Sequence, residues 1–281
     1  MKDIHYRPGI LGVCVLVLLS INLGGCGRSP ESATFQTDAR DDNDNLASVS
    51  NSVPVLYDGF EGKTLGDFWM PGNYGSGRYV PGAIILSTNY ARSGTHSAAI
   101  TVHEGDIDAA GDDDTRVERA ELDSGHFPLR GRDAWYGFSL LAPNDFPIVD
   151  DRLVIAQFKQ LDVSRPIVAQ RFRNGKHIVT VESQGRKESY KLPPIPLGQW
   201  VDMVYHLRYS TGTDGLVEIW MNGKQVVRYS GPAADPDAKN DFYNKIGLYR
   251  DRLKVPMTIY YDNYAMGGSQ EAVEPERIHQ H

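Results

Sequence analysis

Short runs of alternating hydrophobic and polar residues recur along most of the chain. They occupy residues 134–142, 152–160, 176–183, 199–210, 215–230, 245–250 and 257–267, and Gly, Pro, Asn or Asp residues separate them. A period of two places successive side chains on opposite faces of a β-strand. Asn222-Gly223, between two such runs, favours a tight hairpin turn. The number and spacing of the runs predict an all-β protein, a β-sandwich of the jelly-roll type.

The two ends of the chain lack this alternation. Residues 1–25 combine a short basic start with an apolar run that is too short for a comfortable transmembrane span but typical of a secretory signal peptide. Residues 26–52 are rich in Ser, Asp and Asn, and we expect them to form a flexible tether. We expect residues 53–268 to be the folded domain and residues 269–281 to be a disordered tail.

The end of the signal region carries a second feature. Leu23–Cys26, read as Leu-Gly-Gly-Cys, resembles the lipobox of bacterial lipoproteins. The resemblance implies cleavage before Cys26 and lipidation of that cysteine; an ordinary signal peptide with an incidental cysteine is the alternative. The next residue is Gly27 rather than the Asp that retains lipoproteins at the inner membrane. We therefore expect a lipid-anchored protein at the outer membrane or in the periplasm.

Composition narrows the choice of ligand. The 281 residues are 41% hydrophobic and 23% charged, ordinary proportions for a globular domain, and the formal net charge is −7. Such a chain is not expected to bind nucleic acid, so an acidic ligand would need a local cluster of Arg and Lys. The two cysteines, Cys14 and Cys26, precede the folded domain, which we expect to be a monomer without a disulfide or thiol nucleophile.

Four of the expected strands combine an apolar face with a polar one. The polar faces carry Val117, Arg119, Glu121 and Asp123 in the first strand, Ile155, Gln157 and Lys159 in the second, Asp202, His206 and Arg208 in the third, and Lys245, Gly247, Tyr249 and Asp251 in the fourth. Opposite them lie residues such as Val154, Ala156 and Phe158. A solvated outer face is the alternative interpretation, but Arg, Gln, His and Tyr are groups that hold a carboxylate in a fixed geometry. We therefore expect these faces to line one groove.

Three short motifs on these strands resemble a known family. Arg-Ala-Glu-Leu at 119–122, Gln-Phe-Lys at 157–159 and Lys-Ile-Gly-Leu-Tyr at 245–249 follow the order and spacing of the signature strands of jelly-roll polysaccharide lyases. In the alginate lyases these strands read R-[ST]-E-L-R, Q-[IV]-H and Y-F-K-x-G-x-Y, whereas the surrounding sequence looks more like the heparin and glucuronan lyase branch. The resemblance covers most of residues 53–268 and implies a concanavalin-like jelly roll with a concave groove.

The resemblance also implies a reaction, β-elimination in a uronic-acid polysaccharide. A base removes the proton at C5 beside the carboxylate, and the oxygen at C4 leaves. The site must neutralise the carboxylate and stabilise the developing negative charge, roles that we assign to Arg119 and Gln157. Tyr249 is the expected acid and a candidate base, with Lys245 lowering its pKa, and Gly247 is expected to leave room for the sugar.

Two positions depart from the alginate pattern. Lys159 stands where the pattern has a histidine, and Asp123 stands where it has a second arginine. By face parity His206 is the expected replacement for the histidine, and His126 and His103 are alternatives on loops. The residues that we expect to contact the polymer are Lys159, Glu121, Arg208, Arg250 and Gly247.

No cofactor is required for this chemistry, but the chain ends resemble a calcium site. Residues 57–62 and 260–267 look like the paired first and last strands of concanavalin-like sandwiches, which often hold a structural calcium ion. Glu61 and Asp262 are the oxygen ligands that we assign to it. One other function stays open, a non-catalytic carbohydrate-binding lipoprotein of the same fold. A third candidate is a glycoside hydrolase of the laminarinase type. The hydrolase would need an E-x-D-x-E strand, which Glu118–Asp123 does not supply.

Overall fold

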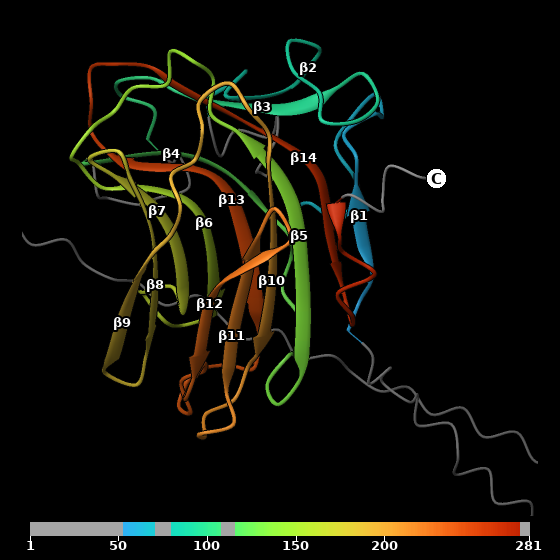
Figure 1. The fold of residues 1–281 in the computed structure, drawn as a ribbon, viewed down its shortest axis with the longest axis vertical. Helices are drawn as coiled ribbons and strands as arrows, with labels where there is room; N and C mark the ends of the chain where they lie inside the picture. Colours follow the sequence, from blue (N-terminus) through green and yellow to red (C-terminus); the bar gives the residue numbers. More distant parts are fainter. Residues whose placement is uncertain (1–52, 71–79, 108–115, 276–281) are drawn as a thin grey trace, which may run out of the picture. The chain divides into compact units, whose positions relative to one another are not determined.

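Two antiparallel β-sheets form the protein, as the alternation predicts (Figure 1). The computed structural model describes residues 53–70, 80–107 and 116–275, so the predicted signal peptide, the tether and Cys26 lie outside the described residues. Within these ranges no helix is long and apolar enough to cross a membrane. The strands are β1 (Leu56–Asp58), β2 (Ile84–Ser87), β3 (Ser97–Val102), β4 (Val117–Asp123), β5 (Asp133–Leu141), β6 (Leu153–Gln160), β7 (Val168–Arg173), β8 (Lys176–Ser183), β9 (Arg186–Lys191), β10 (Val201–Arg208), β11 (Leu216–Met221), β12 (Lys224–Ser230), β13 (Phe242–Asp251) and β14 (Met257–Gly267).

The strand order differs from the order along the chain. An eight-stranded sheet runs β12-β11-β10-β5-β14-β3-β2, with β1 pairing to β14, and a six-stranded sheet runs β4-β13-β6-β7-β8-β9. The chain therefore crosses between the sheets several times, as at β12 to β13 and β13 to β14. The β11–β12 hairpin turns at Asn222-Gly223, where both residues have positive φ (49° and 73°), which confirms the predicted hairpin turn.

One hydrophobic core lies between the sheets. Its largest members include Tyr136, Phe138, Phe158 and Tyr205, all fully buried. They come from both sheets, and the rings of Phe158 and Tyr205 lie 4.6 Å apart between their centroids. Burial of these large rings is the main force that holds the two sheets face to face.

Two irregularities in the six-stranded sheet change which side chains face outward. The register of β6 against β7 shifts between Val154 and Ala156, and that of β13 against β6 shifts between Ile246 and Tyr249. The first shift turns Ile155 into the core. Our prediction of the faces was therefore wrong at this point: Ile155 lies inside, and Val154 lies on the outer face opposite Tyr249.

A chain of hydrogen bonds crosses the core between the sheets. The Tyr205 hydroxyl on β10 donates to the Gln170 side-chain oxygen (2.6 Å), and the Gln170 amide donates to Nε2 of His177 (2.8 Å). Nδ1 of His177 donates to the Pro193 carbonyl (2.9 Å), which fixes the neutral ring with its proton on Nδ1. Burial lowers the pKa of His177 to about 4.

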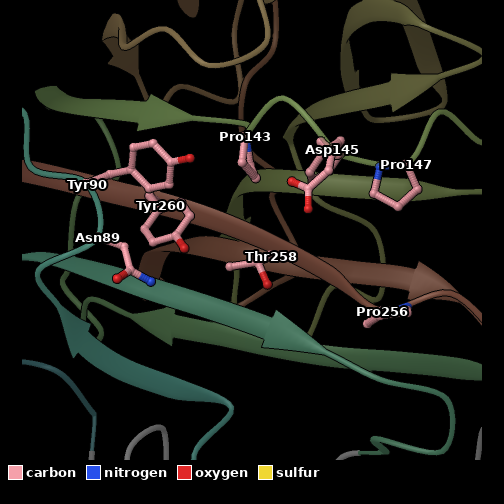
Figure 2. A pocket seen from close by; sticks show the side chains of 9 residues that line it. Asn89, Tyr90, Pro143, Asp145, Pro147, Pro256, Thr258 and Tyr260 are labelled. Atoms are coloured by element: carbon pink, nitrogen blue, oxygen red, sulfur yellow. The ribbon is translucent and has the colours of Figure 1, made fainter.

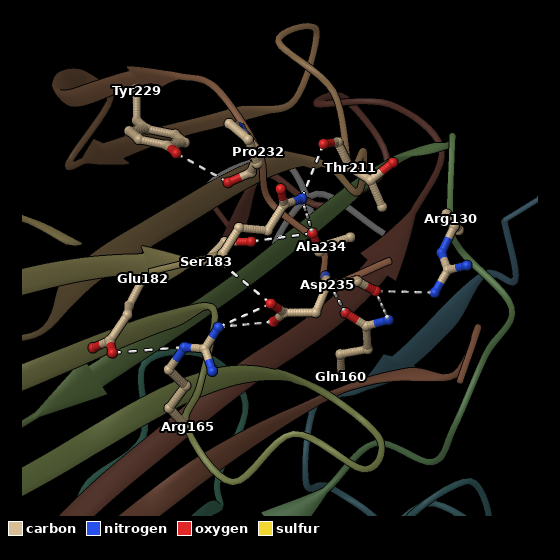
Figure 3. Close-up of polar contacts among 11 residues, drawn as sticks. Arg130, Gln160, Arg165, Glu182, Ser183, Thr211, Tyr229, Pro232, Ala234 and Asp235 are labelled. Carbon is tan, nitrogen blue, oxygen red and sulfur yellow. Dashed lines mark hydrogen bonds and ion pairs between the residues drawn. The ribbon is translucent and has the colours of Figure 1, made fainter. Parts of the chain in front are cut away.

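A loop that crosses between the sheets is held at the end of the six-stranded sheet (Figure 3). Arg165 binds the Asp235 carboxylate at 2.9 Å and approaches Glu182 on β8. The Gln160 side chain donates to the Asp235 carbonyl and accepts from its N–H, while Arg130 donates to the same carbonyl. These contacts fix the chain just before β13 begins.

The end of the folded domain lies beyond the predicted boundary. Residues 269–275, which we expected to be part of a disordered tail, are described, and Val273 is fully buried against Val204, Ala265 and the side of Trp135. Only residues 276–281 of that predicted tail lie outside the described residues. Val273 is a single large apolar residue in a polar segment, and one such residue does not predict a packed structure from the sequence.

Candidate functional site

Three adjacent strands of the six-stranded sheet bring the motif residues together. On β13, Lys245 lies directly opposite Asp123 of β4 and Gln157 of β6. Tyr249 lies opposite Arg119 of β4. Because paired residues of neighbouring strands point to the same face, all five side chains share the outer face of this sheet. The spatial grouping that we predicted for these strands is present in the structure.

The Tyr249 ring lies against two guanidinium groups. Cζ of Arg119 is 4.4 Å and Cζ of Arg152 is 4.9 Å from the ring centroid. Arg152 also forms an ion pair with Asp251, which fixes its position. Cation–π contact of this kind stabilises both partners and places two positive charges beside the phenol. Sequence reasoning missed Arg152, although it begins the run that predicted β6.

The amide and ammonium groups of the cluster already have partners in the protein. The Gln157 amide donates a short hydrogen bond to Oε1 of Glu121, and Nζ of Lys245 lies 3.6 Å from the Asp123 carboxylate. Oε2 of Glu121 is buried and has no hydrogen bond to another described residue. The two acids therefore orient Gln157 and Lys245.

Positive charge dominates the rest of this face. By strand register the basic side chains on this face are Arg119, Lys159, Arg171, Arg173, Lys176, Lys187, Lys191 and Lys245, and the acidic ones are Glu121, Asp123, Glu182 and Asp251. Arg152 and Asp150 lie beside the face, paired with Asp251 and Arg173. Burial and the nearby Lys245 lower the pKa of Lys159, and burial and Arg152 lower the pKa of Arg171. A chain of net charge −7 thus presents a local basic surface. Such a surface attracts an anionic ligand.

His206 and Arg208 lie elsewhere, so their predicted placement was wrong. Their strand β10 belongs to the eight-stranded sheet, and they point to the outer side of that sheet. His206 lies between the carboxylates of Asp133 (2.8 Å) and Glu218 (3.0 Å), and Arg208 also binds Asp133. Alternation shows which residues share a strand face, but it does not show which sheet the strand joins.

Arg250 was also assigned wrongly. It lies on the core side of β13, fully buried, with its guanidinium 2.8 Å from the equally buried Glu118 carboxylate. Its other N–H groups donate to the Val255 and Leu253 carbonyls. An arginine engaged in this way inside the sandwich cannot contact a polymer on the outer face.

Gly247 has a different role from the one predicted. Its φ is 143°, and a Cβ atom there would lie 2.3 Å from the Ala120 carbonyl oxygen and 2.8 Å from Cα of Glu121. The glycine is therefore required by the bulge of β13 and its close approach to β4. The space that a side chain would fill belongs to the neighbouring backbone and not to a sugar.

Comparison with known proteins decides the family. The family model for polysaccharide lyases matches residues 58–265. The chain belongs to the polysaccharide lyase family. No curated protein matches the sequence.

Several solved structures have a similar fold to this chain, although their sequence identity to it is low. An endo-β-1,4-glucuronan lyase from the fungus Trichoderma reesei is 17% identical, with 69% of this chain and 90% of that chain covered and a TM-score of 0.57. A family 7 alginate lyase is 17% identical, with 68% and 85% covered and a TM-score of 0.50. The catalytic domain of a GH131 β-glucanase from Podospora anserina is 14% identical, with 79% and 99% covered and a TM-score of 0.54. These likenesses show the jelly-roll fold.

One histidine of this chain lies beside the motif residues. The His126 ring stacks on the Tyr243 ring with 4.6 Å between centroids. The Nζ atoms of Lys245 and Lys159 lie 5.7 Å and 5.9 Å from the same Tyr243 centroid. His103, the other alternative, is paired with Asp106 in the loop after β3.

The carboxylates assigned to calcium hold a loop instead. Asp262 accepts hydrogen bonds from the backbone N–H groups of Arg92 and Ser93, and Glu61 accepts from those of Thr95 and His96. Oxygens that already accept several N–H donors do not fit a calcium ion, which needs them as ligands. Among the described residues, no group of three or more His, Cys, Asp or Glu side chains is arranged to hold a metal ion.

Proposed function

We propose that this chain is a lyase that cleaves a uronic-acid-containing polysaccharide by β-elimination. The observation that carries the proposal is the group formed by Arg119, Gln157, Lys245 and Tyr249 on one basic sheet face. The fold by itself is a weaker argument, because a β-glucanase shares it. A glycosidase would need two carboxyl groups as acid and base or nucleophile, and the nearby Glu121 and Asp123 are engaged with Gln157 and Lys245.

The first step of the proposed reaction is neutralisation of the substrate carboxylate. The Arg119 guanidinium and the second N–H of the Gln157 amide bind the two carboxylate oxygens. Glu121 fixes the direction of the Gln157 amide through its hydrogen bond, so that no reorganisation is needed when the substrate arrives. Preorganised donors of this kind stabilise the charge that develops on the carboxylate when the C5 proton is removed.

Proton transfer completes the reaction. A base removes the C5 proton, the electron pair forms the C4–C5 double bond, and the C4–O4 bond breaks. Tyr249 then donates its proton to the leaving O4. Tyr249 itself, in its ionised form, or Lys159 is the base, since the lowered pKa of Lys159 raises its neutral fraction above that of an ordinary lysine.

The test measures formation of the unsaturated uronate by its ultraviolet absorbance. Wild-type protein is incubated with glucuronan, alginate, heparin-type chains and pectate, and the polymer that reacts is used for the variants. Tyr249→Phe should lower kcat by a factor on the order of a hundred or more while binding persists. Arg119→Ala should lower kcat by at least about a hundredfold. Tyr57→Phe, which removes a hydroxyl from the other sheet, is the control and should leave turnover unchanged.

The outcomes separate the two readings of the site. Binding of an acidic polymer by wild-type protein without any product would replace the lyase by a carbohydrate-binding protein of the same fold. Turnover by Tyr249→Phe at the wild-type rate would remove Tyr249 from the mechanism. Early melting of Arg119→Ala with full activity per folded molecule would show that this side chain has a structural role only.

A further inference from the structure

A separate pocket lies on the eight-stranded sheet, away from the basic face. It has a volume of about 510 Å³ and is lined by Asn89, Tyr90, Pro143, Asp145, Phe146, Pro147, Pro256, Thr258 and Tyr260 (Figure 2). Thr258 and Tyr260 belong to β14, and their neighbours Ile259 and Tyr261 point into the core. The pocket therefore opens on the outer side of the eight-stranded sheet, beneath the loops that follow β5 and β13.

Several residues restrict the conformation of the pocket walls. Three of the lining residues are prolines, whose φ is fixed, and Phe146 anchors its loop because its side chain is buried in the main core. The Ser97 hydroxyl donates to the Tyr90 carbonyl at 2.6 Å, which holds the Tyr90 backbone in place. A preformed cavity binds a ligand without an ordering cost in the protein.

Two tyrosines form an aromatic corner at one end of the pocket. The Tyr90 and Tyr260 rings lie 4.8 Å apart between centroids at an interplanar angle of 62°. Tyr90 is half-buried, and Tyr260 packs on Ala99 and Leu141 in a cluster separate from the main core. Figure 2 shows both rings at one end and Pro147 and Pro256 at the other. An aromatic ring at a cavity wall offers a flat apolar surface on which the C–H face of a sugar can pack.

The polar side chains of the pocket determine the charge of its ligand. Asn89, Asp145 and Thr258 supply amide, carboxylate and hydroxyl groups, which together donate to and accept from sugar hydroxyls. Among the described residues that line it, none is Lys, Arg or His. The Asp145 carboxylate, which lies beside the open space in Figure 2, would repel a uronate carboxylate. This lining is the electrostatic opposite of the basic face on the other sheet.

We propose that this pocket is a second saccharide site, which binds an uncharged pyranose unit of a neutral glycan. The ring packs against Tyr90, and its hydroxyls bind Asp145, Asn89 and Thr258. The site acts independently of the lyase chemistry, because the two lie on different sheets. It would hold the protein on a neutral sugar while the basic face engages an acidic one.

Binding is measured by isothermal titration calorimetry with cellohexaose, mannohexaose and xylohexaose, and with a hexaglucuronate as the acidic probe. At least one neutral probe should bind with a Kd on the order of 1 mM or tighter. Tyr90→Ala and Asp145→Ala should each weaken that binding about tenfold, by loss of the ring contact and of the carboxylate acceptor. Asp67→Ala, an exposed acid outside the pocket, is the matched control and should bind as wild type does.

Other results would overturn the proposal. One is that none of the three neutral oligosaccharides binds. Another is that Tyr90→Ala and Asp145→Ala both bind them as wild type does. A third is that Arg119→Ala loses this binding while Tyr90→Ala keeps it. Lyase activity of Tyr90→Ala on the acidic polymer should equal that of wild type. A fall in that activity with thermal stability unchanged would contradict the independence of the two sites.

Discussion

His177 allows a quantitative prediction about stability and pH. The residue is 1% exposed, and Nε2 accepts a hydrogen bond from the Gln170 amide, which requires the neutral ring. A second proton on Nε2 would face the Gln170 amide N–H, and turning that amide over would take its oxygen away from Tyr205. Acidification should therefore destabilise the fold through this residue, because the unfolded chain can accept a proton that the folded protein resists.

The magnitude follows from the two pKa values. The pKa of His177 is 6.5 in the unfolded reference and about 4 in the fold. Because the pKa of His177 is lower in the folded protein than in the unfolded chain, protonation favours unfolding. The free energy of unfolding therefore carries no penalty from His177 above pH 6.5 and falls as the pH drops from 6.5 towards 4. The full loss is about 3 kcal/mol, and the part lost between about pH 7.5 and about pH 5 is roughly 2 kcal/mol.

Urea unfolding at these two pH values, for wild type and for His177→Asn, is the assay. Asparagine keeps a donor for the Pro193 carbonyl but does not titrate, so its cost should be similar at both values. Asp262 acts in the opposite direction, because burial raises its pKa to about 6 and acidification removes an unfavourable charge, but it contributes equally to both proteins. Wild type should lose about 2 kcal/mol more than the variant does. Equal losses in the two proteins would refute the linkage, as would an NMR titration of His177 near its ordinary pKa.

Three further predictions concern the site and the chain ends. Lys159→Arg keeps the positive charge but cannot lose its proton near neutral pH. If Lys159 is the base, polymer binding should persist, turnover should fall by about a hundredfold, and the limb of the pH–rate profile that rises with pH as Lys159 loses its proton should vanish. Unchanged kinetics would exclude Lys159 as the base. Gly247→Ala should lower the free energy of unfolding, measured by urea denaturation, by at least about 1 kcal/mol, because its Cβ would collide with the β4 backbone. Wild-type stability of this variant would show that the bulge adapts freely. We propose that Cys26 is lipidated, so Cys26→Ser should leave the precursor uncleaved and free of lipid in a bacterial host; release of the wild-type protein in a soluble form would exclude the anchor.

The sequence was sufficient for most of the fold because its strands alternate clearly. The outer faces of β4, β6 and β13 were identified from period-two patterns, and their motif order indicated that they meet. Strand β9, Arg186–Lys191, carries polar residues at nearly every position, so alternation could not reveal it. The partner of a strand is set by packing across the whole core, which is why β10 and its His206 were placed on the wrong sheet.

The error in the predicted faces of β6 has one physical origin. Alternation along β6 breaks because Ile155 and Ala156 both point into the core, which moves Val154 to the outer face. An unbroken β13 would then place an outward residue opposite an inward one. The extra residue of β13 between Ile246 and Tyr249 restores the match, so that Tyr249 lies opposite Val154 while its register with Arg119 stays intact.

The bulge therefore connects the backbone to the proposed chemistry. Gly247 tolerates the required φ of 143° at a point where the backbones of β13 and β4 approach too closely for a side chain. On the core side, the Tyr261 hydroxyl donates to the Ile155 carbonyl inside the same irregular region and lies 3.3 Å from the Gly247 carbonyl. A glycine and a buried tyrosine thus hold the strand so that the Tyr249 phenol lies between two guanidinium groups. The Lys-x-Gly-x-Tyr spacing is required first by the sheet, and the position of the phenol follows from it.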